Sequence, residues 1–182
     1  ALGAVVVYAA TRLVDIAELR RFLAFRRSEF VIAGATALAV LVVGVLEGIV
    51  VAIALSLADL LRRVSRPHDA VQGFVPDLAG MHDIDDYPEA SLLPGLMVYS
   101  YDSPLFFANA EDFKARALRT VATSADPVRW FVLNVEANVE VDITATDALE
   151  ELRQALTDQG VIFALARVKR DLATDLAPTG FL

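Results

Sequence analysis

An apolar run over residues 28–58, in which only Glu29 and Glu47 are charged, is the feature that most constrains this chain. A single helix over the run would be about 47 Å long, whereas the hydrocarbon core of a membrane is about 30 Å thick. One straight membrane-spanning helix is therefore too long. Gly44 and Gly48 bracket Glu47 near the middle of the run, and we expect the chain to turn there. The run thus predicts a pair of apolar helices.

The two predicted helices, residues 29–45 and 48–62, have arginines on both sides. Four precede the apolar run and three follow it: Arg20, Arg21, Arg26 and Arg27, then Arg62, Arg63 and Arg66. Cytoplasmic flanks of membrane helices are enriched in Lys and Arg, so both ends of the pair should be cytoplasmic, which needs an even number of crossings. The pattern predicts a transmembrane hairpin. A buried helix pair in a soluble protein is the alternative.

The segment before the hairpin has a different pattern. In residues 15–25, apolar Ile16, Leu19 and Leu23 recur at helical spacing among charged residues, and Asp15 suits the N-cap position. This predicts an amphipathic helix lying at the cytoplasmic interface of a membrane. Residues 1–10 are expected to be the tail of an earlier membrane helix.

Charge divides the chain into two parts. Residues 1–66 hold eight arginines against five acids, for a net charge of +3, whereas residues 67–182 hold eight basic and 19 acidic residues, for −11. With 56% hydrophobic residues overall, the chain is too apolar for a purely soluble domain. The acidic second part argues against nucleic acid as a partner, because phosphate backbones need clustered Lys and Arg. There is no cysteine, which excludes disulfides and thiol chemistry.

Residues 67–182 alternate between strand-like and helix-like segments, which predicts an α/β domain with helices packed on a sheet. Pro67 ends the preceding helix, and residues 76–95, rich in Pro, Gly and Asp, are expected to form a long surface connection. The predicted strands are 71–75, 96–101, 128–135 and 161–168, and the predicted helices are 108–122, 145–160 and 170–180.

Neither histidine of this part has the spacing of a metal site. His68 and His82 lie in polar segments and are interpreted as solvated loop residues, so no metal site is predicted. Three phenylalanines, Phe106, Phe107 and Phe113, are expected in the core. Asn109 is expected to cap the helix that follows.

Four segments resemble one known family in sequence and in order. These are SPLFFANAEDF (103–113), VDITATDALEEL (141–152), residues 160–182, and the apolar segment 26–68. The first three resemble the sulfate-transporter and anti-sigma-factor-antagonist (STAS) domain in the form carried by SulP anion permeases. The fourth resembles the last transmembrane hairpin of the same permeases.

This resemblance implies a proton- or sodium-coupled, or exchanging, transporter of sulfate-like or bicarbonate-like anions. Family members are built from two inverted seven-helix repeats and usually work as dimers. Their substrate lies between half-helices upstream of this sequence, with the helix N-termini facing the anion. Residues 1–66 would then belong to the gate or scaffold domain, with no substrate ligand. Residues 67–182 would form the cytoplasmic STAS domain, truncated at its C-terminus.

The loop in VDITATDALEEL has more than one interpretation. Thr144 precedes Asp147 by three residues, a capping-box-like spacing, so the loop can be a helix start capped by Thr144. In soluble anti-sigma antagonists the aspartate matching Asp142 precedes a phosphorylated serine. Here Ile143 takes that place, which leaves Thr144 as the phospho-acceptor candidate. Asn134 stands where the family often has an acid, which weakens this hypothesis further.

Nucleotide binding is a third interpretation of the same loop, because backbone N–H groups at a helix start can receive a phosphate. Nearby carboxylates would oppose a phosphate unless a cation intervened, so a guanine or adenine nucleotide would bind together with Mg²⁺. The candidate residues of this regulatory or nucleotide-binding loop are Asn134, Asp142, Thr144 and Thr146. No His, Cys or Lys occurs in the loop, so no catalytic residue is predicted.

The sequence therefore predicts the C-terminal part of a secondary-active inorganic anion (sulfate-type) transporter, and not an enzyme. Its STAS domain would serve dimerisation, trafficking or regulation. The alternative is a membrane-anchored regulatory module that responds to a nucleotide or to phosphorylation. Expected partners are membrane lipid, the upstream transmembrane domain of the same chain, a second copy in a homodimer and a cytoplasmic regulatory protein. The expected location is the cell (inner) membrane, with several crossings and the STAS domain in the cytoplasm.

Overall fold

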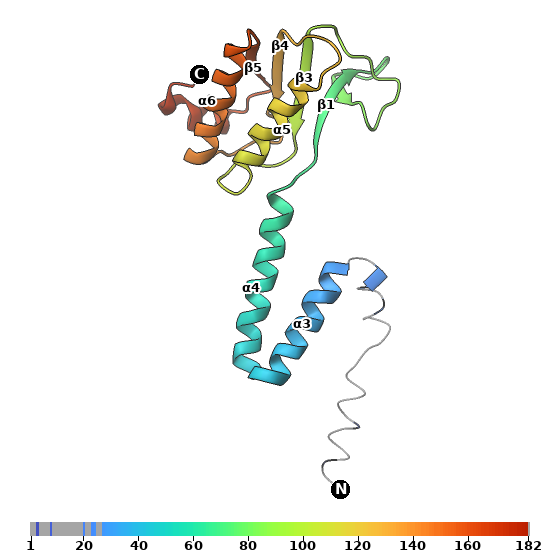
Figure 1. Ribbon diagram of the computed structural model, residues 1–182, viewed down its shortest axis with the longest axis vertical. Helices are drawn as coiled ribbons and strands as arrows, with labels where there is room; N and C mark the ends of the chain where they lie inside the picture. The colour runs from blue at the N-terminus through green and yellow to red at the C-terminus, as the bar shows by residue number, and fades with distance from the viewer. Residues whose placement is uncertain (1–2, 4–7, 9–19, 21–22, 25–26, 182) are drawn as a thin grey trace. The chain divides into compact units, whose positions relative to one another are not determined.

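The computed structural model describes residues 3, 8, 20, 23–24 and 27–181 (Figure 1). The chain forms two compact units, Ala1–Leu61 and Arg62–Leu182. The predicted interfacial helix over residues 15–25 and the predicted helix tail over residues 1–10 fall on positions that lie almost entirely outside the described residues. Both stay predictions.

The first unit contains a helical hairpin. Helix α3 spans Arg27–Val43 and helix α4 spans Val45–Val64, which confirms the predicted pair of helices. Gly44 lies between them with φ +114°, a backbone conformation that favours glycine, so the expected turn is at this residue. Gly48 is buried beside the turn, where a Cβ atom would lie 2.3 Å from Val40 Cγ2. The two helices approach closely there because Gly48 has no side chain.

The apolar side chains of this hairpin remain exposed. Helix α3 buries no residue, and α4 buries only Gly48. In the described part of the chain, no helix is both long enough and apolar enough to span a membrane. The predicted crossing of a membrane stays a prediction.

The second unit is built on a five-stranded mixed sheet in the order β2-β1-β3-β4-β5. Strand β1 pairs antiparallel with β2 and with β3, whereas β3, β4 and β5 are parallel. The strands are β1 Asp69–Phe74, β2 Met81–Asp83, β3 Leu96–Tyr101, β4 Trp130–Asn134 and β5 Ile162–Ala166. The helices are α5 Ala110–Ala122, α6 Ile143–Asp158 and α7 Arg170–Leu176, followed by a 3₁₀ turn, Ala177–Thr179.

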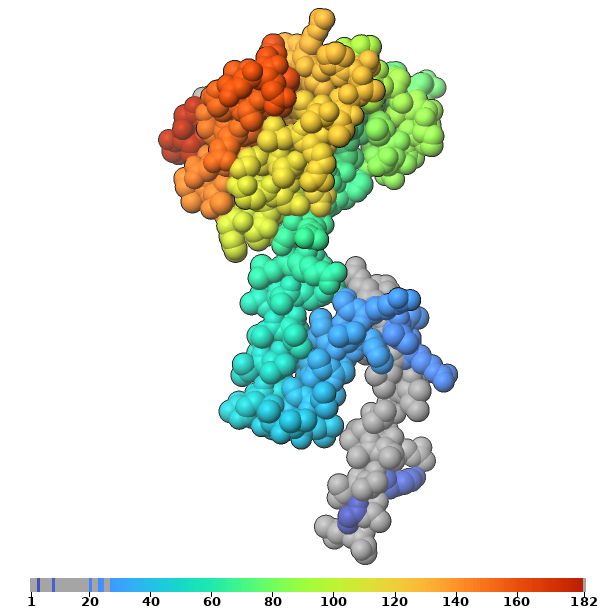
Figure 2. All heavy atoms as spheres, viewed as in Figure 1, coloured from blue at the N-terminus to red at the C-terminus, as the bar shows by residue number. Residues whose placement is uncertain are grey.

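The parallel strands are joined by helices, as parallel pairs require. Helix α5 follows β3 and α6 follows β4, and the two helices pack side by side over the sheet (Figure 1). Figure 2 shows them as one continuous surface on the viewed face. The predicted α/β fold, with helices packed on a sheet, is confirmed.

Aromatic side chains form the centre of the core between the sheet and these helices. Tyr99, Tyr101, Phe113 and Phe131 are each at most 1% exposed. Phe113 of α5 meets the ring of Tyr101 edge-on at 5.3 Å between centroids, and Phe131 stacks on Phe163 of β5 at 6.1 Å. Buried aromatic pairs of this kind add to the stabilisation from apolar area alone.

One strand differs from the sequence-based expectation. Residues 76–95 were expected to form a surface connection, but Met81–Asp83 within them pair with β1, with Gly73 opposite His82. The segment is only three residues long and has no apolar alternation, so periodicity carries no signal for it. Pairing with the edge of β1 makes it a strand.

Candidate functional site

Asp142 joins two segments at the start of helix α6. Its carboxylate Oδ1 accepts a hydrogen bond from the Ala145 backbone N–H at 2.8 Å, which caps the helix. Its Oδ2 accepts one from the Phe107 backbone N–H, also at 2.8 Å. Asp142 has extended backbone angles, as N-cap residues do. One carboxylate therefore both starts α6 and fastens the loop before α5 to it.

The capping role predicted for Thr144 is wrong. Helix α6 begins at Ile143, so Thr144 is already the second residue of the helix and its side chain faces solvent. The physical reason is which backbone N–H group each side chain can reach. An N-cap side chain bonds the backbone N–H two or three residues later, and the Asp142 carboxylate already occupies that of Ala145. Thr144 is thereby left exposed on the first turn.

The other candidate residues have different surroundings. Thr146 is buried, and its hydroxyl donates to the Asp142 carbonyl at 3.0 Å. The Asn134 amide donates to Gln72 Oε1 of β1 at 3.0 Å, and its Oδ1 accepts from the backbone N–H of Glu136. Thus Asp142, Thr144 and Thr146 share the first turn of α6. Asn134 instead bonds to β1 and to the turn after β4.

We expect Asp142→Ala to lower the free energy of unfolding by about 1–2 kcal/mol, because it removes a helix cap and frees the Phe107 N–H. Thr144→Ala is the matched control and should change it by less than about 0.5 kcal/mol, as for an exposed residue. Urea unfolding followed by the fluorescence of Trp130, the single tryptophan, reports on this unit. An equal loss in the two variants would contradict the assignment of the cap.

Two exposed apolar side chains flank the Asp142 cap. Phe107 is 66% exposed and Ile143 is 70% exposed, and the Asp142 carboxylate links their segments. The prediction that Phe107 lies in the core is wrong, whereas that for Phe113 is confirmed. The Phe107 ring instead meets Phe106 edge-on at 5.5 Å. The Phe107 and Ile143 side chains are therefore both accessible to another molecule.

Asn109 occupies the N-cap position of α5 but makes no capping bond. Its buried side chain is directed toward the preceding loop, where Oδ1 accepts from the Phe106 N–H at 2.9 Å and Nδ2 donates to the Pro104 carbonyl at 2.9 Å. The prediction of a capping side chain is therefore wrong. Asn109 fixes the loop whose Phe107 N–H reaches Asp142.

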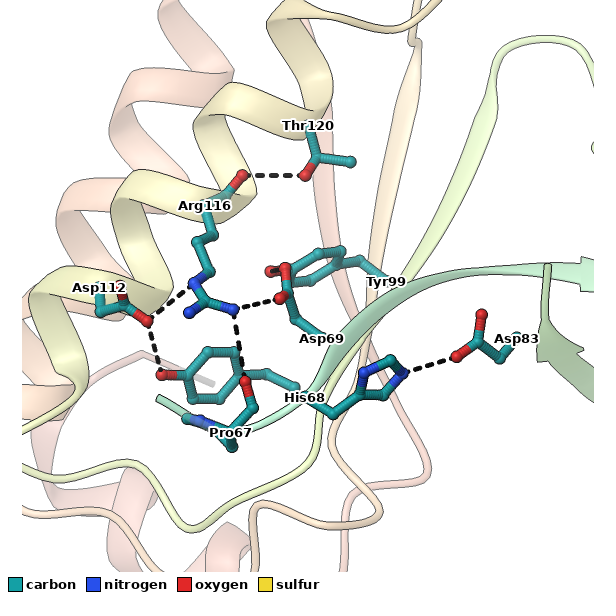
Figure 3. Close-up of polar contacts among 9 residues, drawn as sticks. Pro67, His68, Asp69, Asp83, Tyr99, Asp112, Arg116 and Thr120 are labelled. Atoms are coloured by element: carbon teal, nitrogen blue, oxygen red, sulfur yellow. Dashed lines mark hydrogen bonds and ion pairs between the residues drawn. The ribbon is translucent and has the colours of Figure 1, made fainter. Parts of the chain in front are cut away.

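A polar cluster around Arg116 lies at the start of β1, and no sequence pattern indicated it (Figure 3). The guanidinium pairs with Asp69 of β1 and, at 2.8 Å, with Asp112 one turn earlier on α5. It also donates to the Pro67 carbonyl at 3.3 Å. Only the spacing of Asp112 and Arg116, four residues apart on a helix, was visible in the sequence.

Two buried tyrosines complete this cluster. The Tyr99 hydroxyl donates to Asp69 at 2.5 Å, and the Tyr101 hydroxyl donates to Asp112 at 3.3 Å. Burial raises the pKa of both phenols, and the neighbouring carboxylates raise it further. Both tyrosines therefore stay protonated donors. The cluster fixes the polypeptide between α4 and the sheet.

His68, next to this cluster, pairs with a carboxylate on β2. Its Nε2 lies 2.7 Å from Asp83 Oδ2 (Figure 3). The hydrogen bond to Asp83 raises the pKa of the imidazole above its ordinary value, and the carboxylates of Asp102 and Asp69 add to this. Burial opposes ionisation of Asp83, but the bond from His68 and the backbone N–H groups of Asp85 and Asp86 together outweigh it, so the pKa of that carboxyl is lowered. The interpretation of His68 as a merely solvated loop residue is incomplete.

The pair should make stability depend on pH. Because folding raises the pKa of His68, its contribution is fully present below about pH 6.5, the ordinary value, and is lost as pH rises through the folded value. We therefore expect the unfolding free energy to fall as pH rises above about 6.5, and His68→Gln to remove that part of the slope. His82→Gln, which leaves the pair intact, is the control. An unchanged slope in His68→Gln would contradict the prediction.

A shallow groove of about 860 Å³ lies between α6 and the last described residues. Its wall is charged on the α6 side, where Arg153 pairs with Glu150 at 2.7 Å from Nε. Asp147 and Glu150 would oppose a phosphate group here. The lining residues are Ile143, Thr146, Asp147, Glu150, Arg153, Pro178, Thr179, Gly180 and Phe181.

The strand order and the helix start at Asp142 together define a fold that can be compared with known proteins. Residues 87–182 match the family model of the STAS domain. The chain belongs to the STAS domain family. The STAS match covers the parallel strands, α5 and α6, and therefore the whole candidate loop.

Relatives of the complete chain are named as sulfate transporters. A probable sulfate transporter of Mycobacterium tuberculosis is 59% identical over 182 residues, which is 100% of this chain and 32% of the relative. Sulfate transporter 3.1 of Arabidopsis thaliana is 24% identical over 189 residues, covering 100% of this chain and 29% of the relative. The chain thus spans about a third of the length of the relatives that it matches.

A solved membrane transporter shares the fold. The murine solute carrier 26 family member A9 anion transporter, in the inward-facing state, matches with a TM-score of 0.81 at 20% identity. The match covers 93% of this chain and 27% of that one. Identity at this level shows the fold alone.

Proposed function

We propose that this chain is the C-terminal part of a secondary-active inorganic anion transporter of the sulfate type, whose STAS domain regulates transport. The observation that carries the proposal is 59% identity, over the whole chain, to a protein named a probable sulfate transporter. The alignment covers the apolar hairpin as well as the STAS domain. The fold of a solved anion transporter supports the same proposal.

The surface of the hairpin supports insertion in the inner membrane. Large apolar side chains are exposed along α3 and α4; Leu41 is 83% exposed, Val42 73%, Leu46 72% and Ile53 63%. Water disfavours so much exposed apolar surface, whereas lipid or further membrane helices of the same chain would cover it. The proposed arrangement places the STAS domain in the cytoplasm, on the side that carries the arginines.

The first turn of α6 is the proposed regulatory surface. Phe107 and Ile143 offer an apolar contact for a cytoplasmic regulatory protein or for the second copy of a homodimer, and Thr144, next to Ile143, is exposed. Because Thr144 does not cap the helix, its hydroxyl is available as a phospho-acceptor. A phosphate there would gain from the positive helix start but would lie near the Asp142 carboxylate.

A Mg²⁺-bound adenine or guanine nucleotide at the same turn is the second proposal for regulation. The support for it is the helix start itself, which is a general phosphate-binding feature. Against it, the Asp142 carboxylate already occupies the Ala145 N–H. The protein contact is therefore the favoured use of this surface.

Transport by the full-length protein that carries this chain tests the proposal. Reconstituted in vesicles, it should take up labelled sulfate, and unlabelled sulfate should compete. Ile143→Asp should change the rate or its regulation while Trp130 fluorescence reports an intact fold. Absence of anion uptake by protein that is folded and inserted would overturn the transporter proposal and favour the membrane-anchored regulatory module.

A further inference from the structure

We propose a binding site for a phosphate- or sulfate-type oxyanion where the end of α4 meets the start of α5. A pocket of about 460 Å³ lies there within the second unit. Its lining residues are Arg62, Ser65, Arg66, Ala108 and Asp112. The pocket is separate from the first turn of α6 and from the groove along that helix.

Arg62 and Arg66 provide the positive charge of this pocket. Arg62 lies in the last turn of α4 and Arg66 two residues after its end, and both line the pocket. Both are exposed, and neither makes an ion pair or a hydrogen bond with the residues that the structure describes. By contrast, Arg116 and Arg153 each pair with a carboxylate. Two neighbouring guanidinium groups with no carboxylate partner in the described part of the chain favour an external anion.

The one acid in the pocket wall is already neutralised. Asp112 accepts from Arg116 Nε at 2.8 Å and from the Tyr101 hydroxyl at 3.3 Å (Figure 3). Arg116 thus balances the negative charge of Asp112 within the wall. The pocket therefore retains the positive charge of Arg62 and Arg66.

The chemistry of guanidinium selects the class of ligand. Its planar set of N–H donors matches the oxygens of phosphate or sulfate and bonds them in pairs. Helix α5 begins beside this pocket, which Ala108 and Asp112 line, and its start has no side-chain cap. The partial positive charge of this helix start adds to the attraction for an anion. Such an oxyanion could be the head group of an acidic phospholipid or the free anion. The lipid source rests on the proposed membrane insertion.

Binding can be tested with the full chain in detergent and in lipid nanodiscs. In detergent, inorganic phosphate and sulfate are titrated and followed by calorimetry. In nanodiscs, thermal unfolding is compared between phosphatidylcholine alone and the same lipid with phosphatidic acid. We expect saturable anion binding in detergent or a lipid-dependent rise in Tm in nanodiscs. Each of Arg62→Gln and Arg66→Gln should weaken the anion affinity about tenfold, and should reduce the rise in Tm. Arg63→Gln, on the same turn but outside the pocket, should weaken it less than about threefold.

Each outcome has a defined meaning. Binding of free anion without a lipid effect identifies the soluble source, and the reverse identifies the head group; both support the site. Equal loss in Arg62→Gln and Arg63→Gln would show diffuse surface attraction and overturn it. Absence of both effects would also overturn it. Insertion into phosphatidylcholine nanodiscs is scored separately, so a failure of the membrane proposal is distinguishable from a failure of this site.

Discussion

Asn138→Asp should lower the free energy of unfolding of the STAS domain by about 4 kcal/mol. Asn138 is fully buried, and its Nδ2 donates to the carbonyls of Tyr101, at 2.9 Å, and Ser103, at 2.5 Å. Its Oδ1 has no hydrogen-bond partner among the described residues. Aspartate would replace the donor with an oxygen facing two carbonyl oxygens, and would bury a carboxyl group without a partner.

The matched control is Asn134→Asp, the same exchange nearby in the chain. Asn134 is only partly buried, and its amide bonds a side chain, Gln72, that can rotate toward water. We expect a loss of about 1 kcal/mol or less. Urea unfolding of the whole chain in detergent, followed by Trp130 fluorescence, measures both variants. Similar losses in the two variants would show that the buried carbonyls do not depend on Asn138.

Arg116→Ala should cost about 2–3 kcal/mol of unfolding free energy. It leaves Asp69 and Asp112 without their cation, with their side chains only 22% and 34% exposed. Removing one partner of a fully buried pair typically costs about 3–5 kcal/mol, and partial exposure reduces that value. Arg116→Lys keeps the positive charge and should recover part of the loss. Recovery should be incomplete because one ammonium group cannot bond both carboxylates in the same forked geometry.

Arg119→Ala, on the same helix, is the control. Its side chain is exposed, so we expect a change within about 0.5 kcal/mol. A double-mutant cycle with Asp69→Asn isolates the direct coupling between Arg116 and Asp69. A coupling energy near zero would mean that the cluster stabilises the domain through packing of the arginine stem and not through its charge.

Most of the fold was readable in the sequence because its elements carry strong periodic signals. The apolar segments of β4 and β5 and the amphipathic helices between them are local patterns, and the glycine between α3 and α4 marks a turn by its conformational freedom. The three-residue strand β2 carries no such pattern. It forms because its backbone pairs with the free edge of β1.

The candidate site was less predictable, since its contacts join residues far apart in the chain. Asp142 and Thr144 both have side chains suited to capping, and only the backbone path shows that Asp142 reaches the Ala145 N–H. That Asp142 also binds the Phe107 N–H, 35 residues earlier, has no local signal. The same holds for Arg116, whose partner Asp69 is 47 residues earlier.

The position of β1 in the sheet has a mechanical consequence. Only residues 65–68, which contain Pro67 and no glycine, connect α4 to this strand, and the Pro67 carbonyl accepts a bond from Arg116. Strand β1 pairs with β2 along one edge and β3 along the other. A force that pulls on this connection therefore acts along β1. To move the strand, the force must break its hydrogen bonds to β2 and to β3 together. The last turn of α4 from Arg62 onward belongs to the same unit as the sheet, so a force on it would reach β1 along the chain through residues 65–68.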